Sequence, residues 1–377
     1  MNFDYNEEQQ LLAASIRRFV DKDYGFESRR KIIASRDGYS PAIWSTLAHL
    51  GVLGLPLPSE FGGFGGGAVD LLSVMEAFGE ALVVEPFFAT VALSAQLIAR
   101  GGTPAQKARV FPAVARGELV LAFAQIERGA RYDLAHVATR ARRTSDGYVL
   151  DGEKRVVLHA PCAQCLVVSA RTDGEAAQPQ GISLFAVDAT APGVTLRRYR
   201  TIDAMPAADV SLHGVKVGTD ALISAENEAL PLIEEVVDYA TALVCAEAVG
   251  AIKSANDATL EYLKTRRQFG VPIGSFQALQ HRMVDMVVSY EQAKSMASLA
   301  CATVDGERDP ARRKRIVSAA KVRIADACRQ VSQEAVQLHG GMGMSDEMKV
   351  SHTFRRLTMI AQQFGDADHH LERFART

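Results

Sequence analysis

The stretch that decides the fold is residues 262–270, which read YLKTRRQFG. Phe276-Gln277 follows it closely, residues 337–341 read QLHGG, and residues 361–366 read AQQFGD. Helical periodicity runs between these motifs, so we expect each of them at or near the end of a long helix. These motifs therefore mark the expected helix ends of the C-terminal half.

The C-terminal half is predicted to form four long helices. Pro231 stands where a first helical residue can lack its N–H, and Asp309-Pro310 is a good N-cap and first-residue pair. Short connections between the helices favour an antiparallel bundle. The predicted helices cover residues 232–265, 276–304, 310–339 and 345–364.

The N-terminal part is also predicted to be helical. Apolar residues recur there at helical spacing, and the glycine-rich run at residues 61–67 is interpreted as a tight turn between helices rather than a phosphate cradle. The predicted helices cover residues 7–20, 42–50, 70–81 and 89–99.

The period changes in the middle of the chain. Short apolar runs bounded by Gly, Pro and Asp predict strands at residues 120–124, 148–150, 166–168, 182–187 and 210–212. The fold class is therefore α+β, multi-domain and mostly α. We expect a helical domain at residues 1–118, a middle antiparallel β-barrel at residues 119–225 and a C-terminal four-helix bundle at residues 226–377.

Composition argues against several classes of partner and site. The 377 residues carry 42 basic and 44 acidic side chains, so no basic face for nucleic acid or an anionic membrane is implied. No stretch reaches the roughly 20 apolar residues of a membrane span, and the acidic start at residues 1–5 lacks the parts of an export leader. Cys162 and Cys165 have no second pair to complete a zinc site, and residues 368–370 (DHH) have no third ligand, so no metal is expected. A cytoplasmic protein fits these features.

In order and spacing, the C-terminal motifs resemble those of the acyl-CoA dehydrogenase family. The resemblance covers nearly the whole chain, including residues 7–9 (EEQ) and 58–63 (PSEFGG), and is strongest between Tyr262 and Gly343. It implies helical, β and helical domains in succession, an FAD cofactor, an acyl-CoA substrate and an electron-transfer flavoprotein as the electron acceptor.

In that family FAD lies between two subunits, with the flavin ring on one β-domain and the diphosphate and adenosine on the neighbour's bundle. The resemblance implies that the Arg266 and Arg267 guanidinium groups pair with diphosphate oxygens and that Gly340 and Gly341 admit the ligand close to the backbone. Each element alone is more typical of solvated arginines, a core Phe or a plain helix end, but their joint order and spacing favour the cofactor. The implied cofactor-binding residues are Arg266, Arg267, Gln268, Phe269, Phe276, Gln277, Gln337, Gly340 and Gly341.

The flavin-binding half departs from the family. Where the family reads Thr-Glu-Pro-x-Ala-Gly-Ser-Asp, residues 126–133 read IERGARYD, so Ile126 replaces a hydroxyl and Arg131-Tyr132 replaces Gly-Ser. The family's Trp-x-Thr corresponds to residues 156–158 (VVL). The positions that keep the family's spacing are Glu127, Asp133, Gly152 and Lys154.

The family's catalytic base is also missing. The Glu of the family's Tyr-Glu-Gly-Thr segment corresponds to Phe364, and the base position of some other members corresponds to Ala240. An apolar side chain cannot accept the substrate's α proton, a step to which a positioned base contributes roughly 10²–10⁴-fold. The carboxylates that could serve as a relocated base are Asp238, Glu247 and Asp366.

We therefore expect a hetero-oligomer of α2β2 type. The chain resembles the small subunits of bacterial acyl-CoA dehydrogenases of the pimeloyl-CoA and steroid side-chain type, which lack the base. A partner catalytic acyl-CoA dehydrogenase subunit would bring the flavin pocket and the Glu, and the assembly would convert a bulky or carboxylated acyl-CoA to its trans-2-enoyl-CoA. Two alternatives stay open: an autonomous homotetrameric flavoenzyme with a relocated base, and a flavin-free scaffold subunit.

Overall fold

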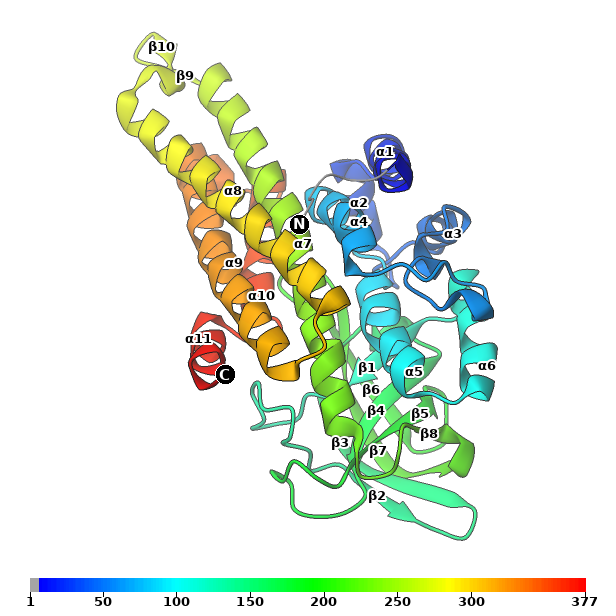
Figure 1. The fold of residues 1–377 in the computed structure, drawn as a ribbon. Coiled ribbons are helices and arrows are strands. Elements are labelled where there is room, and N and C mark those ends of the chain that lie inside the picture. Colours follow the sequence, from blue (N-terminus) through cyan, green and yellow to red (C-terminus); the bar gives the residue numbers. More distant parts are fainter. Residues whose placement is uncertain (1–6) are drawn as a thin grey trace. The chain divides into compact units, whose positions relative to one another are not determined.

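The computed structural model describes residues 7–377, which form helices, then strands, then helices (Figure 1). Residues 1–5, on which the expectation about an export leader rests, lie outside the described residues. The described chain packs as two compact units, one made of residues 7–31, 68–83 and 241–377 and the other of residues 32–67 and 84–240. The predicted domain limits stay a prediction.

Short helices form the first part of the chain, as predicted. The glycine-rich run follows a 3₁₀ turn, η2 (Ser59–Phe61), and leads into α4, as a turn between helices should. The segment predicted at residues 89–99 begins as a π-helical stretch, η3 (Phe88–Ser94), and continues into α5. Every residue of the π-helical stretch is buried. The α-helices are α1 (Glu7–Asp23), α2 (Phe26–Ala34), α3 (Pro41–His49), α4 (Ala68–Ala81), α5 (Ala95–Gly101) and α6 (Pro104–Ala115).

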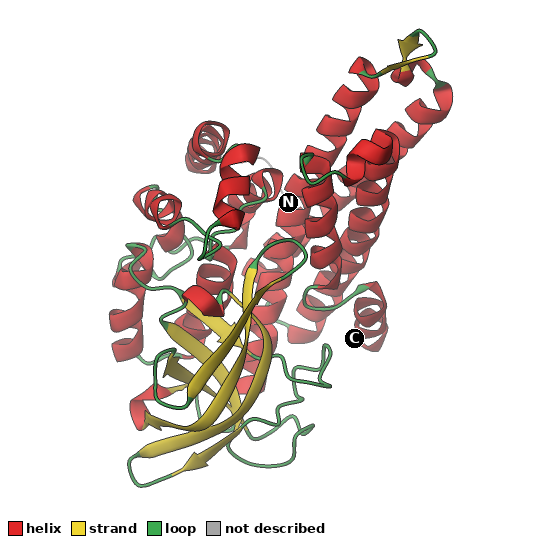
Figure 2. Cartoon of the chain, turned by 180° about the vertical axis from the view of Figure 1, so that it is seen from behind, coloured by secondary structure: helices red, strands yellow, loops and turns green. Residues whose placement is uncertain are grey.

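One eight-stranded sheet forms the middle part (Figure 2). The longest pairing joins β3 and β7 in antiparallel register, and the buried face carries apolar side chains such as Leu150, Phe185 and Leu212. All five predicted strand segments lie in this sheet. The strands are β1 (Leu121–Ala124), β2 (Arg140–Arg143), β3 (Gly147–Leu158), β4 (Cys165–Arg171), β5 (Ile182–Asp188), β6 (Val194–Arg200), β7 (Pro206–Gly218) and β8 (Leu222–Ile223).

The sheet differs from the predicted antiparallel β-barrel in two ways. Its order is β6-β7-β3-β2-β4-β5-β8, and within the described residues the two terminal strands do not pair with each other, so the sheet is open. It is also mixed, because β1 and β2 both pair with β4 in parallel. The reason lies in the end strands. β8 has only two residues, and β6 carries Arg197, Arg198 and Arg200, charges of the kind that keep a sheet edge unpaired.

Four long helices and a short one end the chain, so the C-terminal part is helical as predicted. α9 follows Asp309, whose side chain accepts the N–H of Ala311, and ends at Gly340, as predicted. α7 begins at Ala229, so Pro231 lies within its first turn rather than at its first position. The short helix α11 has no counterpart among the predicted helices, and it packs against α9, as α8 and α10 do. The helices are α7 (Ala229–Thr265), α8 (Gln277–Gly306), α9 (Pro310–His339), α10 (Lys349–Gln362) and α11 (Ala367–Arg376).

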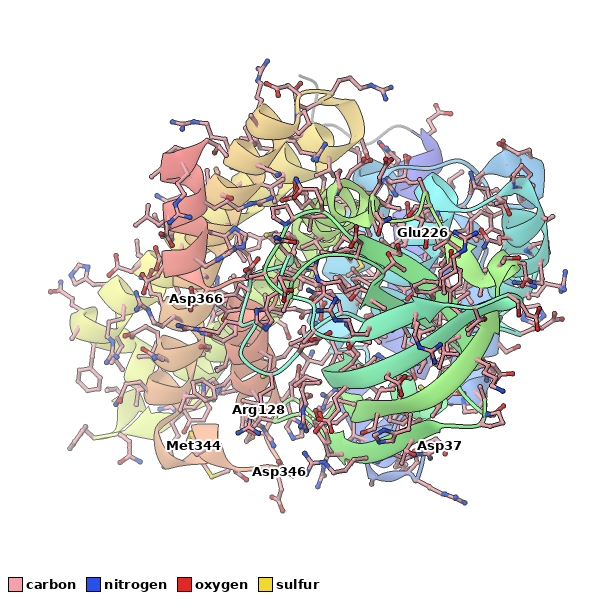
Figure 3. All side chains as sticks on the ribbon, turned by 90° about the horizontal axis from the view of Figure 1, so that it is seen from below. Asp37, Arg128, Glu226, Met344, Asp346 and Asp366 are labelled. Atoms are coloured by element: carbon pink, nitrogen blue, oxygen red, sulfur yellow. The ribbon has the colours of Figure 1, made fainter. Side chains whose placement is uncertain are left out.

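The start of α11 is fixed by two polar side chains. Asp366, labelled in Figure 3, is the N-cap, because its carboxylate accepts the backbone N–H three residues on at 2.9 Å. The buried ring of His370 places Nε2 3.1 Å from the carbonyl oxygen of Phe364. Burial, with a smaller effect from Lys321, lowers the pKa of His370 to about 2.

Helices α4 and α7 touch through their backbones. A Cβ atom on Gly79 would lie 1.8 Å from the carbonyl oxygen of Glu247, and a Cβ atom on Gly250 would lie 1.8 Å from the carbonyl oxygen of Glu76. Each helix therefore presents a glycine to a carbonyl group of the other. No larger side chain fits between them at this crossing.

Replacing Gly250 with alanine is expected to destabilise the chain by about 2 kcal/mol, because the two helices must move apart to admit a methyl group. Urea unfolding followed by circular dichroism measures this difference. The matched control is Gly306→Ala at the end of α8, where an added Cβ meets nothing within 4 Å. Equal unfolding midpoints for the two variants would contradict the close crossing.

The buried His370 gives stability a pH dependence of defined sign. Its pKa is about 2 in the folded chain and near 6.5 in the unfolded chain, so the unfolded state binds a proton that the folded state does not. The contribution of the neutral His370 ring to the free energy of unfolding is complete above pH 6.5. As the pH falls toward 2 this contribution is lost, by up to about 1.4 kcal/mol per pH unit. A His370→Gln variant should show a flatter fall of the urea midpoint below pH 6.5 than the unaltered chain. An identical slope would mean that the folded chain protonates this ring normally.

Candidate functional site

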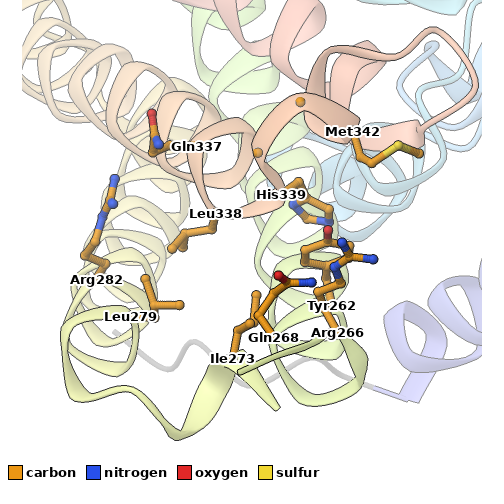
Figure 4. Close-up of a pocket in the computed structure, with 12 residues that line it drawn as sticks. Tyr262, Arg266, Gln268, Ile273, Leu279, Arg282, Gln337, Leu338, His339 and Met342 are labelled. Carbon is orange, nitrogen blue, oxygen red and sulfur yellow. The ribbon is translucent and has the colours of Figure 1, made fainter. Parts of the chain in front are cut away.

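A pocket of about 570 Å³ lies at one end of the C-terminal helices (Figure 4). Its wall comes from the end of α7, the start of α8, the end of α9 and a small hairpin of β9 (Arg267–Gln268) and β10 (Val271–Pro272). The lining residues are Tyr262, Arg266, Gln268, Ile273, Leu279, Arg282, Gln337, Leu338, His339, Gly340, Gly341 and Met342. All of them belong to one compact unit.

The pocket brings together part of the predicted cofactor set. Arg266, Gln268, Gln337, Gly340 and Gly341 all line it. At both glycines a Cβ would meet nothing within 4 Å, so the backbone there is open to a ligand. A guanidinium group, two amides and accessible main chain are groups that can bind the oxygens of a phosphate ester.

The other predicted residues lie beside the pocket and do not line it. Phe269 and Gly270 form the two-residue turn of the hairpin, both with positive φ (55° and 81°), and the Phe269 side chain is 92% exposed. Its ring meets that of Phe276 edge-on at 6.2 Å. Arg267 belongs to the exposed strand β9, and Gln277 is the first residue of α8.

Several lining residues were not predicted. His339 and Tyr262 stack with ring centroids 4.4 Å apart, and Arg282 forms a 2.6 Å ion pair with Glu334 on α9. Helical spacing could have indicated some of these positions. Tyr262 lies in the last turn of α7, four residues before Arg266, and Leu279 and Arg282 are three residues apart on α8. The unpredicted lining residues are Tyr262, Ile273, Leu279, Arg282, Leu338, His339 and Met342.

In the sheet unit, Glu127 has a structural role. Its carboxylate lies 2.6 Å from Lys154 Nζ, with both side chains buried, and accepts the backbone N–H groups of Ala138 and Thr139. Burial alone would raise the pKa of Glu127, but the Lys154 charge and these bonds hold it below its usual value. This ion pair preserves the framework at two positions that keep the family's spacing.

Three of the altered flavin-side positions, Ile126, Arg131 and Val156, present side chains to solvent. Ile126 is 41% exposed and Val156 is 40% exposed, and the N–H of Arg155 donates to the Ile126 carbonyl at 2.7 Å. Arg131 is exposed and has a φ of 47°, while Val156 has a φ of 50°. These are conformations that favour glycine, yet they carry bulky or β-branched side chains. The residues present therefore do not fit a flavin ring that needs close approach to the backbone.

Phe364 lies in the turn between α10 and α11. Its φ is 61°, and its carbonyl oxygen accepts a bond from the His370 ring. The following carbonyl, that of Gly365, and that of Ala361 accept bonds from Lys321 Nζ at 2.7 and 3.2 Å. The turn is thus held from within by two buried side chains.

The three candidate carboxylates are buried or engaged. Both Glu247 oxygens contact Arg356, at 2.6 and 2.7 Å, and both side chains are buried. Asp366 caps α11, and Asp238 is fully buried in α7, as is Ala240. None of these arrangements presents a carboxylate poised as a base.

Among residues 7–377 no group of three or more His, Cys, Asp or Glu side chains could hold a metal ion. Cys162 and Cys165 are half-buried thiols in a 3₁₀ turn and at the start of β4, and burial raises their pKa values to about 12 and about 11. None of the helices in the described part has the length and apolar character to span a membrane.

Comparison with known proteins gives matches along the chain. Profiles of the acyl-CoA dehydrogenase N-terminal, middle and C-terminal domains match residues 6–118, 122–215 and 230–377. The acyl-CoA dehydrogenase FadE12 of Mycobacterium tuberculosis is 31% identical over 367 residues, which cover 96% of this chain and 93% of that protein.

Solved structures agree with these matches. A chain of the ChsE4-ChsE5 complex from Mycobacterium tuberculosis superposes with a TM-score of 0.89 at 26% identity, covering 100% of this chain and 98% of that one. A variant of the Tcur3481-Tcur3483 steroid ACAD superposes with a TM-score of 0.87 at 29% identity, covering 98% and 97%. FAD, predicted from the resemblance, is confirmed as the cofactor of the family whose profiles match the chain. Matched in sequence and in fold over nearly its whole length, the chain belongs to the acyl-CoA dehydrogenase family.

Proposed function

We propose that this chain is the subunit of a hetero-oligomeric acyl-CoA dehydrogenase that supplies the nucleotide-binding half of an FAD site and no catalytic base. The observation that carries the proposal is a contrast within the chain. The pocket at Arg266, Gln337 and Gly340 is open and carries a guanidinium group and an amide beside accessible main chain, while Phe364 stands at the position that the resemblance assigns to the family's base.

The partner is a catalytic acyl-CoA dehydrogenase chain, in an α2β2 assembly. The structural relatives include two complexes of paired proteins, ChsE4-ChsE5 and Tcur3481-Tcur3483, and the second is described as a steroid ACAD. The exposed Phe269 also favours a partner, because an aromatic ring that is 92% exposed in a left-handed backbone gains little from its edge-on contact with Phe276 alone.

In this assembly the chain's own residues bind and orient the cofactor. Arg266 pairs with the diphosphate, Gln337 donates its amide, and the Gly340-Gly341 backbone lies against the nucleotide. When bound, FAD supplies the acceptor for the hydride that leaves the substrate's β carbon. The partner's Glu takes the α proton, the product is the trans-2-enoyl-CoA of a bulky or carboxylated acyl-CoA, and an electron-transfer flavoprotein receives the electrons.

The alternative of an autonomous flavoenzyme requires a carboxylate that can take a proton from the substrate. Glu247 is held by Arg356 in a buried ion pair, and breaking such a pair costs about 3–5 kcal/mol. Asp366 is engaged in capping a helix. These two engagements favour the shared site over a relocated base.

The complex with the partner, obtained by co-expression with a neighbouring acyl-CoA dehydrogenase gene, is expected to contain one FAD for every two chains. Arg266→Ala should lower the flavin content several-fold, because a charge-assisted bidentate contact to the diphosphate is lost. Flavin absorbance against chain concentration measures both quantities. The matched control is Arg308→Ala, an exposed arginine in the turn between α8 and α9.

Other ratios of FAD to protein chain would indicate another function. One FAD per chain, with oxidation of acyl-CoA by this chain alone, would indicate the autonomous enzyme. A stable complex that never contains FAD would indicate the scaffold subunit. Equal flavin content in the Arg266→Ala and Arg308→Ala complexes would remove Arg266 from the cofactor site.

Restoring a carboxylate at the base position is not expected to restore activity. A Phe364→Glu chain, purified alone, should show no acyl-CoA-dependent dye reduction, because Ile126, Arg131 and Val156 still occupy the flavin side. Phe364→Leu serves as the packing control, and a panel of acyl-CoA thioesters as substrates. Flavin-linked turnover by the Phe364→Glu chain alone would show that its own β-domain can seat the ring.

A further inference from the structure

The ring of His339 forms part of the pocket wall and is 3% exposed (Figure 4). Its Nδ1 atom lies 2.8 Å from the carbonyl oxygen of Ala335, one turn back on α9. Its other nitrogen, Nε2, has no hydrogen-bond partner among the residues that the structure describes. The polar edge of this ring is therefore available to a ligand in the pocket.

The contact at Nδ1 decides the chemical character of Nε2. A carbonyl oxygen can only accept, so Nδ1 carries the hydrogen. Burial lowers the pKa of His339, so the ring is neutral near pH 7 and Nε2 carries a lone pair. Nε2 is thus an acceptor, in a pocket whose other polar groups include the donors Arg266 and Arg282.

The tyrosine of the YLKTRRQFG motif fixes the ring's position. Tyr262 stacks on His339 at 4.4 Å with an interplanar angle of 27°, which restrains rotation about the outer side-chain bond. With Nδ1 bonded to the helix backbone, the ring is held at two points. Nε2 is consequently presented in one direction before any ligand arrives.

We propose that His339 Nε2 accepts a hydrogen bond from the adenosine end of FAD, and that Tyr262 is the residue that positions it. The inference rests on the proposed function, since it places the nucleotide in this pocket. The phosphates carry no hydrogen at neutral pH and pair with the arginine, so the matching donor is an N–H or O–H group. On adenosine these are the 6-amino group and the ribose hydroxyls.

The test uses the co-expressed complex and FAD itself as the probe. His339→Phe keeps an aromatic ring on Tyr262 but removes the acceptor, and it is expected to weaken FAD binding about tenfold, as the loss of one hydrogen bond to a desolvated donor implies. His339→Gln retains an acceptor and should bind more tightly than His339→Phe. Flavin fluorescence during dilution and re-addition of FAD gives the dissociation constants, and thermal melting of the flavin-free complexes shows that each variant is folded.

A pH profile separates hydrogen bonding from packing. Protonation of His339 turns Nε2 into a donor, so the affinity of the unaltered complex for FAD should fall as the pH drops, and His339→Phe should remove this dependence. The charged groups near the ring are Arg266, Arg282 and Glu334, and Glu334 is ion-paired with Arg282. If the affinity of the His339→Phe complex for FAD falls with decreasing pH as steeply as that of the unaltered complex, the proposal is overturned.

The outcomes also distinguish this inference from the shared site. If Arg266→Ala loses FAD while His339→Phe binds FAD as tightly as the unaltered complex, the role of His339 is overturned and the shared site stands. If no variant of the complex contains FAD, both proposals are overturned. If His339→Phe alone weakens binding and His339→Gln restores it, the acceptor role is established.

Discussion

The backbone contact between α4 and α7 is the constraint on which the helical unit depends. Gly79 and Gly250 each face a carbonyl group of the other helix at a distance that excludes a side chain. The carboxylate of Asp305, beyond the middle of the sequence, accepts the N–H groups of Ala68 and Val69 at 2.8 and 2.9 Å and so caps α4. A helix from the N-terminal part of the chain is thereby built into a unit made mostly of C-terminal residues.

A series of contacts connects this helix crossing to the turn at Phe364. Glu247, whose carbonyl group meets Gly79, uses its side chain to hold Arg356 on α10. α10 leads into the turn at Phe364, where Lys321 holds the carbonyl of Gly365. A helix contact, a buried ion pair and a buried lysine thus fix the turn at Phe364.

The sequence predicted the elements better than the directions of their side chains. Local signals such as Asp309 before Pro310 identify a helix start, since capping involves adjacent residues. His339 and Tyr262 stand far apart in the sequence, and their stacking depends on the rotation of α7 and α9 about their axes. No period of three or four residues specifies that rotation.

The sheet likewise shows that local sequence patterns do not specify how distant segments pair. Short apolar runs predicted five of the eight strands, β1, β3, β4, β5 and β7, but closure into a barrel depends on whether the two end strands pair. Here one end is the arginine-rich β6 and the other is the very short β8. No apolar run predicted either end strand, so the open, mixed sheet could not be read from the runs alone.

Two residues with positive φ show what holds an unfavourable backbone conformation in place. Arg131 and Phe364 stand in left-handed backbone, at a cost of roughly 1–2 kcal/mol each compared with glycine. Such conformations persist only where the surroundings determine them. Around Phe364 those surroundings are visible, because His370 and Lys321 bind the carbonyl groups of the turn. The backbone course is therefore set by the neighbouring bonds and not by the residue at the turn.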